Sequence, residues 1–132
     1  MTPDRPALHK LHVRREFRAV AKGDKQVRRG LVLQARQRDL NAKTYLDDAS
    51  DVDTAIRFGL TATKKIGNAV IRNRTRRRLR VLAHEILSAH GQPGYDYVLI
   101  GRAATNHRTW DGLRTDLRSA LKKLHKTGNK EE

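Results

Sequence analysis

Apolar residues recur at helical spacing in three parts of the chain. The most regular stripe lies near the C-terminus and consists of Trp110, Leu113, Leu117, Leu121 and Leu124. Its intervals of three or four residues predict an amphipathic helix with Thr109 as its N-cap. A second helix is expected from about Asn68 to His90, on a stripe formed by Ile71, Thr75, Leu79, Leu82 and Ile86. A weaker pattern over Leu11–Ala21 predicts a shorter helix that Gly23 ends.

Three short apolar runs predict strands instead of helices. They cover Gly30–Ala35, Arg57–Thr63 and Tyr95–Gly101. Residues 37–55 are polar and contain 5 of the 14 acids, which indicates a loop. The resulting order is helix–strand–strand–helix–strand–helix, with room for a further short strand. This order predicts a small α/β sandwich of the α+β class.

The length of 132 residues fits one domain. We expect residues 11–125 to form this domain, with a flexible lead-in over residues 1–10 and a flexible tail over residues 126–132. Hydrophobic residues make up 37% of the chain, so the domain can build only a modest core.

Basic residues outnumber acidic residues by 29 to 14, which gives a net charge of +15. Nucleic acid is the commonest soluble polyanion that could neutralise such an excess. The absence of cysteine excludes disulfides, a thiolate nucleophile and a cysteine-based zinc site.

Several other functions lack support in the sequence. The longest stretch without Asp, Glu, Lys or Arg is Ile86–Tyr95, which is too short for a membrane-spanning helix of about 20 residues. The N-terminus lacks the apolar core of a secretory signal, so we expect a cytoplasmic protein with no membrane contact. The acids of Asp47–Asp53 lack the glycine and terminal glutamate of a calcium loop, and no glycine-rich phosphate loop occurs. We therefore expect no metal ligands, catalytic residues or small-molecule cofactor in the chain.

The strongest chemical feature is the segment Lys64–Arg80, which reads KKIGNAVIRNRTRRRLR. Its 17 residues contain eight cations and no acid. On a helical wheel, Asn73, Arg77 and Arg80 lie opposite the apolar stripe. Six arginines on one helix repel each other, and guanidinium groups pair with phosphates through two parallel hydrogen bonds. The segment therefore predicts a surface that binds a nucleic-acid backbone.

This segment closely resembles the signature of the bacterial ribonuclease P protein family, with Arg72-Asn73-Arg74 at its centre. The resemblance covers about residues 11–124. It includes Arg15-Glu16-Phe17 and Gly23 in the first helix, Leu31–Leu33 in the first strand, Phe58–Thr63 in the strand before the motif, and Tyr95–Ile100 in the strand after it.

The resemblance implies a function that composition alone does not give. In this family the catalyst is an RNA, and the protein helps it bind precursor tRNA, whose 5′ leader is removed by hydrolysis. The resemblance therefore implies two partners, the catalytic RNA and precursor tRNA, and a protein that is inactive alone. Mg²⁺ is expected to be bound mainly by RNA. The implied fold is like the second domain of ribosomal protein S5, with a left-handed strand–helix–strand crossover.

The resemblance also implies two sets of site residues. Those expected to bind the catalytic RNA are Lys64, Lys65, Arg72, Asn73, Arg74, Arg76, Arg77 and Arg80. Those expected in a cleft for the leader are Phe17, Thr61, Thr63 and Lys64. Further aromatic positions of the family's cleft are here Ala21 and Gln34, so leader binding is expected to depend more on charge. Phe17 either contacts the leader or packs in the core.

Other classes of protein remain as alternatives. A structural RNA-binding protein of ribosomal type, without a role in cleavage, fits the composition equally well, and only the motif disfavours it. A metal-dependent nuclease would need carboxylates clustered in a basic cleft. A DNA-binding helix-turn-helix protein would need two short helices joined by a tight turn, whereas strands flank the basic helix expected here.

Overall fold

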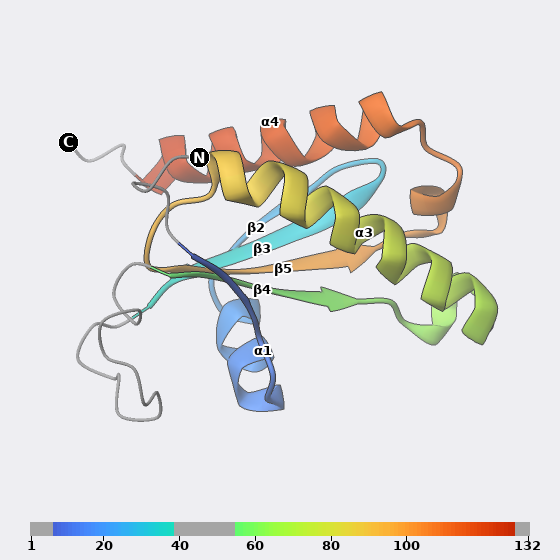
Figure 1. Cartoon of the computed structure of the whole chain (residues 1–132), viewed down its shortest axis with the longest axis horizontal. Coiled ribbons are helices and arrows are strands. Elements are labelled where there is room, and N and C mark those ends of the chain that lie inside the picture. The colour runs from blue at the N-terminus through green and yellow to red at the C-terminus, as the bar shows by residue number, and fades with distance from the viewer. Residues whose placement is uncertain (1–6, 39–54, 129–132) are drawn as a thin grey trace.

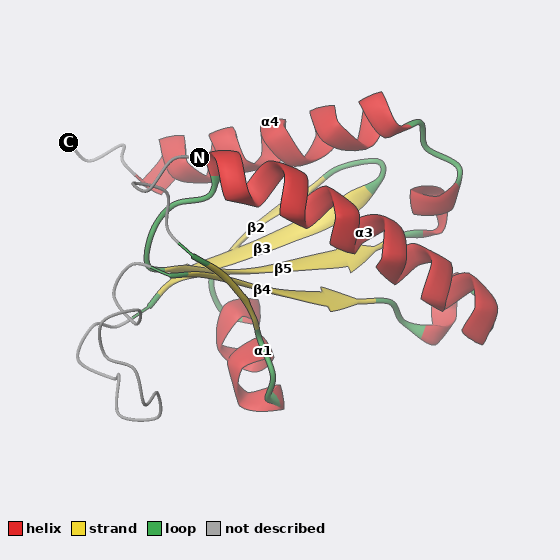
Figure 2. Cartoon of the chain, viewed as in Figure 1, coloured by secondary structure: helices red, strands yellow, loops and turns green. Residues whose placement is uncertain are grey.

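The computed structural model describes residues 7–38 and 55–128 (Figures 1 and 2). The strands are β1 (Leu8–Lys10), β2 (Asp24–Val27), β3 (Leu31–Gln37), β4 (Ile56–Thr61) and β5 (Tyr95–Gly101). The helices are α1 (Arg14–Ala21), α3 (Ala69–His90) and α4 (Trp110–Gly128), with two 3₁₀ turns, η1 (Lys64–Ile66) and η2 (Ala103–Asn106).

The five strands form one mixed sheet in the order β1-β4-β5-β3-β2. Strands β1, β4 and β5 run parallel, whereas β3 is antiparallel to both β5 and β2. Helix α3 connects the neighbouring strands β4 and β5. With these strands pointing to the right and α3 above the sheet, β5 lies behind β4, so the crossover is left-handed (Figure 1). The α/β sandwich and the crossover expected from the sequence are confirmed.

The helices cover the two faces of the sheet unequally. Helices α3 and α4 pack on one face, and α1 packs on the other (Figure 2). Side chains alternate between the faces along each strand. The main core therefore lies under α3 and α4, where Leu33, Phe58, Tyr97 and Leu99 are buried. The smaller core under α1 contains Leu11, Val20 and Val98, with Phe17 and Ile100 packed against it.

The start of α3 follows from local chemistry. Gly67 has a φ of +148°, which favours glycine, and an added Cβ would lie within 2.7 Å of Ile71. The Asn68 side chain then accepts the Ile71 N–H at 3.0 Å and caps the helix. Thr109 caps α4 in the same way, by accepting the Gly112 N–H at 3.0 Å, as predicted.

The sequence pattern does not locate two short strands. Residues 8–10, expected in the flexible lead-in, form β1, and β2 takes the place left for a further short strand. Both are short edge strands with mostly exposed polar residues, so neither shows an apolar period. At the other end, α4 continues to Gly128, beyond the expected boundary at residue 125. The acids of Asp47–Asp53 lie outside the described residues.

One residue of the predicted apolar stripe is not buried. Ile71 is 36% exposed, whereas Thr75, Leu79, Leu82 and Ile86 are buried as predicted. The reason is geometric, because the first turns of α3 extend past the ends of β4 and β5 (Figure 1). Across the two described ranges, no helix has the length and apolar character that a bilayer span requires.

A chain of buried ion pairs fastens α1 to the sheet. Arg57 of β4 donates to both carboxylate oxygens of Asp96 in β5, at 2.8 and 2.6 Å, and to Glu16 of α1 at 3.0 Å. Asp96 also accepts from Arg38 at 2.7 Å. All four side chains are at most 10% exposed. Glu16 closes the first turn of α1 as well, by accepting the backbone N–H of Val13 at 3.2 Å.

Replacing Asp96 should lower the free energy of unfolding of the domain. The variant Asp96→Ala leaves Arg57 and Arg38 buried with less compensation, and breaking a buried pair typically costs about 3–5 kcal/mol. Chemical denaturation measures this loss. The control is Asp111→Ala, which removes a carboxylate that is 95% exposed and should change stability little. Equal stability of the two variants would show that the buried chain is not a structural anchor.

Candidate functional site

The basic segment Lys64–Arg80 follows β4 and occupies the turn η1 and the first half of α3. Lys64 and Lys65 are exposed on η1. In α3, Asn73, Arg74, Arg77 and Arg80 are exposed, and Arg72 and Arg76 are half-buried on the flanks. The structure thus places the eight residues of the predicted catalytic-RNA set on η1 and the following helix, six of them exposed and two half-buried. We call the part of this set on α3, residues 72–80, the basic face.

The basic face has no acidic counterpart on its own helix. The one acid of α3 is Glu85, which lies in the C-terminal half and pairs with Arg114 of α4 at 2.6 Å. The buried stripe of Leu79, Leu82 and Ile86 holds the helix on the sheet while the cations face outwards. The arrangement suits a polyanion, because like charges on one helix face destabilise it in the absence of a partner.

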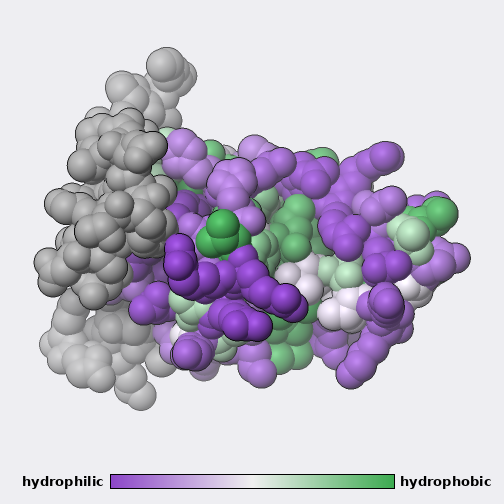
Figure 3. Space-filling view, turned by 90° about the horizontal axis from the view of Figure 1, so that it is seen from below, coloured by the Kyte–Doolittle hydropathy of each residue, from purple (hydrophilic) through white to green (hydrophobic). Residues whose placement is uncertain are grey.

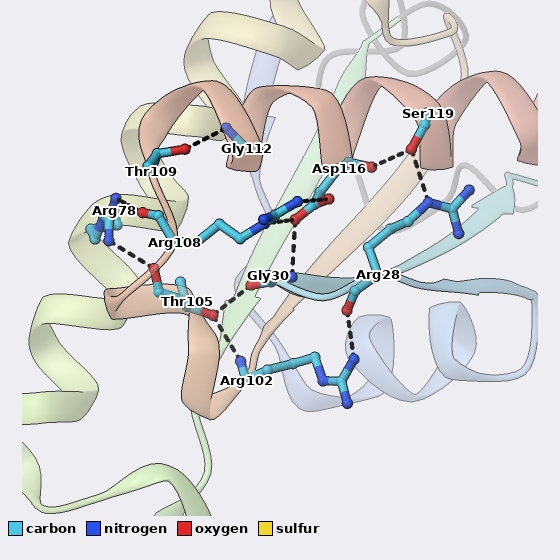
Figure 4. A network of polar contacts seen from close by, with 10 residues as sticks. All are labelled: Arg28, Gly30, Arg78, Arg102, Thr105, Arg108, Thr109, Gly112, Asp116 and Ser119. Atoms are coloured by element: carbon cyan, nitrogen blue, oxygen red, sulfur yellow. Dashed lines mark hydrogen bonds and ion pairs between the residues drawn. The ribbon is translucent and has the colours of Figure 1, made fainter.

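One arginine of the motif has a structural role instead. Arg78 donates to the backbone carbonyls of Thr105 at 2.7 Å and Arg108 at 2.8 Å (Figure 4). Its guanidinium also lies 4.8 Å from the centre of the Trp110 ring. Burial lowers the pKa of Arg78. Arg78 therefore joins α3 to the segment that leads into α4, and it was not among the predicted RNA-binding residues.

The segment that leads into α4 is also hydrogen-bonded to the turn between β2 and β3. The buried carboxylate of Asp116 accepts the Gly30 N–H at 3.0 Å and two hydrogen bonds from Arg108, at 2.9 and 3.0 Å (Figure 4). The hydrogen bond to Asp116 raises the pKa of Arg108. Thr105 donates to the Gly30 carbonyl at 2.6 Å. This network joins the segment that Arg78 contacts to the turn between β2 and β3.

The predicted leader cleft lies on the α1 face of the sheet. The Phe17 ring rests on Gly59 so closely that an added Cβ would lie 2.4 Å from it. Thr61 follows Gly59 on the same face of β4, and Thr63 and Lys64 continue in that direction at the surface. Phe17 and Thr61 therefore share one face of β4, and Thr63 and Lys64 lie in the exposed segment that follows the strand. Phe17 is half-buried, so it takes part in packing and keeps an accessible part.

Aliphatic residues pack with Phe17 on this face of the sheet. Among the described residues, Phe17 is the one aromatic side chain in the cluster packed under α1, since Phe58, Tyr95 and Tyr97 belong to the opposite core. Ala21 is exposed at the end of α1, and Gln34 is half-buried on β3. Seen from the α1 side, the surface is mostly hydrophilic with smaller hydrophobic areas (Figure 3).

A small hollow connects the two predicted sites. It measures about 170 Å³ and is lined by Phe17 of the leader set, by Arg76 and Arg80 of the catalytic-RNA set, and by Lys10 and Leu60. Lys10 is a candidate that sequence reasoning missed, because it was placed in the lead-in. Only the non-local pairing of β1 with β4 brings it here, and no periodic signal could have shown that.

A small α/β domain with an acid-free arginine face is typical of proteins that bind nucleic-acid backbones. Comparison with known proteins is more specific. The model of the Ribonuclease P family matches residues 6–125. The Ribonuclease P protein component of Ruegeria pomeroyi is 46% identical over 116 residues, which cover 87% of this chain and 85% of the relative. That of Gluconacetobacter diazotrophicus is 47% identical over 116 residues, covering 87% and 90%.

Solved structures share the fold. The RNase P protein from Thermotoga maritima superimposes with a TM-score of 0.65 at 21% identity, covering 86% of this chain and 96% of that one. The Staphylococcus aureus RNase P protein gives a TM-score of 0.62 at 23% identity, covering 86% and 92%. The chain belongs to the Ribonuclease P protein component family.

Neighbouring arginines of the motif should differ in their effect on stability. Arg78→Ala removes two hydrogen bonds from a charged group and the contact with Trp110, which should cost about 1–3 kcal/mol. Arg77→Ala changes an exposed side chain, and its effect should stay within about 0.5 kcal/mol. The midpoints of urea unfolding compare the two variants. Equal midpoints would contradict the structural role given to Arg78.

Proposed function

We propose that this chain is the protein subunit of a ribonuclease P ribonucleoprotein, an endoribonuclease in which RNA is the catalyst. The protein binds the catalytic RNA and the 5′ leader of precursor tRNA. In doing so it assists the cleavage that removes the leader and produces the mature 5′ end of the tRNA. The observation that carries this proposal is the acid-free basic face of α3, held outwards by a buried stripe on the same helix.

The basic face, together with Lys64 and Lys65 of η1, supplies the contacts to the catalytic RNA. Lys64, Lys65, Arg72, Asn73, Arg74, Arg76, Arg77 and Arg80 form the proposed set. Arginine pairs with a phosphate through two parallel donors, so several arginines at fixed spacing on a rigid helix can recognise the shape of an RNA backbone. The network around Asp116 and Arg108 supports this role, since it fixes the part of the domain to which α3 is attached.

The α1 face supplies the contacts to the leader. We assign these to Phe17, Thr61, Thr63 and Lys64. The accessible part of the Phe17 ring can stack on an unpaired base, the threonine hydroxyls can pair with phosphate or sugar oxygens, and Lys64 adds charge. Because Ala21 and Gln34 stand where further aromatic residues would extend the cleft, Phe17 carries the stacking alone among the described residues.

Chemistry at the scissile bond belongs to the RNA in this proposal. We expect the Mg²⁺ ions of the complex to be bound mainly by that RNA. In the part of the chain that the structure describes, no three His, Asp or Glu residues gather into a possible metal site. The protein contributes binding and orientation, which lower the cost of holding the substrate in the reactive geometry.

Reconstitution tests the proposal directly. Precursor tRNA is incubated with the catalytic RNA, with the protein, and with both, and the release of the leader is followed by gel electrophoresis. We expect the protein to increase the cleavage efficiency of the RNA and to have no nuclease activity alone. Rapid metal-dependent cleavage by RNA-free protein would overturn the proposal. Tight RNA binding with no effect on cleavage would favour a structural RNA-binding protein of ribosomal type.

Replacing the Phe17 ring should affect precursor tRNA selectively. Phe17→Leu keeps an apolar side chain against Gly59 but removes the flat face on which a base can stack. Stacking on an aromatic residue contributes about 1–3 kcal/mol per base, so the affinity of the reconstituted complex for precursor tRNA should fall by up to roughly 100-fold. Affinity for mature tRNA, which has no leader, should stay unchanged.

A matched control separates stacking from packing. Tyr95→Leu removes another half-buried ring, but this ring packs against the opposite core. The variant should therefore change the affinities for precursor and mature tRNA equally. Unfolding of both variants is measured in parallel. If Phe17→Leu lowers stability strongly and weakens the binding of both tRNAs to the same extent, Phe17 is a core residue and does not belong to the leader site.

A further inference from the structure

A second hollow lies at the end of the molecule away from the basic face. Helices α3 and α4 both start at the end that contains η1, and both run to the opposite end of the sheet (Figure 1). The hollow between their C-terminal parts measures about 320 Å³, and we call it the distal hollow. It is lined by His90, Gln92, Arg118, Leu121, Lys122 and His125. None of these residues belongs to the two RNA-binding sets of the proposed function.

One face of α4 provides most of the distal hollow. The helix contributes four of the lining residues at intervals of three and four positions, so their side chains share one face. Leu121 is buried and gives the hollow an apolar surface, whereas Arg118 and Lys122 are exposed beside it. His90, the last residue of α3, and Gln92 complete the lining.

The two cations of the distal hollow have no acidic partner. Arg118 and Lys122 are one turn apart on α4, and like charges at this spacing destabilise a helix. Within the described ranges, no carboxylate forms an ion pair with either side chain. The acid of α3, Glu85, pairs with Arg114, one turn before Arg118. The distal hollow therefore favours an anion.

Hydrogen bonds hold the ring of His125 in a fixed orientation. The Tyr97 hydroxyl accepts the Gln92 N–H at 2.9 Å and lies 2.7 Å from Nε2 of His125. Burial lowers the pKa of His125, an effect that the charge of Asp24 opposes, so the ring is neutral at pH 7. Both groups are satisfied when the hydroxyl donates to Nε2, which leaves the hydrogen of the ring on Nδ1. Tyr95 packs edge-on against the same ring, with 4.7 Å between the ring centres.

We propose that the distal hollow binds one nucleotide. The base packs against Leu121 and the ring of His125, since bases stack on histidine rings. The phosphate binds to Arg118 and Lys122, so side-chain cations take the role that a glycine-rich loop has in other nucleotide sites. Sites for drug-sized ligands measure about 300–1,000 Å³, and a hollow at the lower end of this range admits a single nucleotide but no double helix.

The nucleotide can come from two sources, a free mononucleotide or an unpaired position of a bound RNA. Both present the same base and phosphate to the distal hollow. In either case the site goes beyond the proposed function, because it lies apart from the basic face and from Phe17.

Titration of the RNA-free protein tests the free source. Adenosine monophosphate is added, and the ring signals of His90 and His125 are followed by NMR. We expect saturable shifts of these signals. Adenosine lacks the phosphate and inorganic phosphate lacks the base, so each should bind roughly tenfold or more weakly than adenosine monophosphate.

Two double variants of α4 locate the phosphate. Arg118→Ala/Lys122→Ala should weaken the binding of adenosine monophosphate roughly tenfold, as expected for a lost hydrogen bond between charged groups. The control Lys123→Ala/Lys126→Ala removes the same charge from exposed positions of the same helix that do not line the hollow, so it should bind like wild type. All four side chains are exposed, and unfolding curves verify that both variants remain folded.

Reconstituted complexes test the RNA source. If a bound RNA places its own nucleotide in the distal hollow, adenosine monophosphate no longer shifts the histidine signals in the complex. Arg118→Ala/Lys122→Ala then lowers the affinity for that RNA more than the control does. If the ligand is a free nucleotide, adenosine monophosphate binds the complex as it binds the protein alone, and the two double variants have equal affinity for RNA.

Three results would overturn the proposal. The first is the absence of saturable binding together with equal RNA affinities of the two double variants. The second is binding of adenosine monophosphate that both variants weaken alike, which indicates general attraction to a basic protein. The third is inorganic phosphate binding as tightly as adenosine monophosphate, which leaves no role for the base. The proposed function stands in all three cases, because the reconstituted cleavage assay tests it separately.

Discussion

The ion pair between Arg57 and Asp96 determines where α1 lies, and the shape of the whole α1 face depends on it. Both residues sit in neighbouring parallel strands, and their charges are buried under the helix. Burial of such charges is unfavourable unless every partner is present. Glu16 brings a carboxylate of α1 to Arg57, so the packing of α1 is coupled to this buried cluster. That packing also brings Phe17 over Gly59, so an electrostatic requirement fixes the place of an aromatic ring.

The two halves of α3 divide stability and binding between them. The C-terminal half contains most of the buried stripe and the one acid of the helix, and it packs on the sheet and α4. The first turns of α3 extend past the sheet (Figure 1), and Arg74 and Arg77 are exposed there. Repulsion among these cations is offset by packing elsewhere in the same helix. Neighbouring residues of the motif also differ in role. Arg78 binds backbone carbonyls of the same domain, whereas the exposed side chain of Arg77 can bind a partner.

The sequence predicts most of the fold because apolar residues recur at regular spacing in its long helices. The stripe ending at Leu124 and the cap at Thr109 are local features, and the structure has both. The motif Lys64–Arg80 likewise identifies the basic face, because spacing alone separates cations from the buried stripe. Burial of Ile71 was predicted wrongly, since a helical wheel cannot show that the sheet ends before the first turn of α3 does.

What the sequence does not show are contacts between distant residues. Arg57 and Asp96 lie in apolar runs 39 residues apart, and nothing local marks them as partners. Strand β1 has no apolar period, yet its length decides how much of the β4 edge is covered, because the chain turns at Leu11 into α1. A longer β1 would pair with Leu60 and close that edge. The early turn into α1 therefore does two things at once: it places Phe17 on the sheet and leaves the neighbouring edge of β4 open.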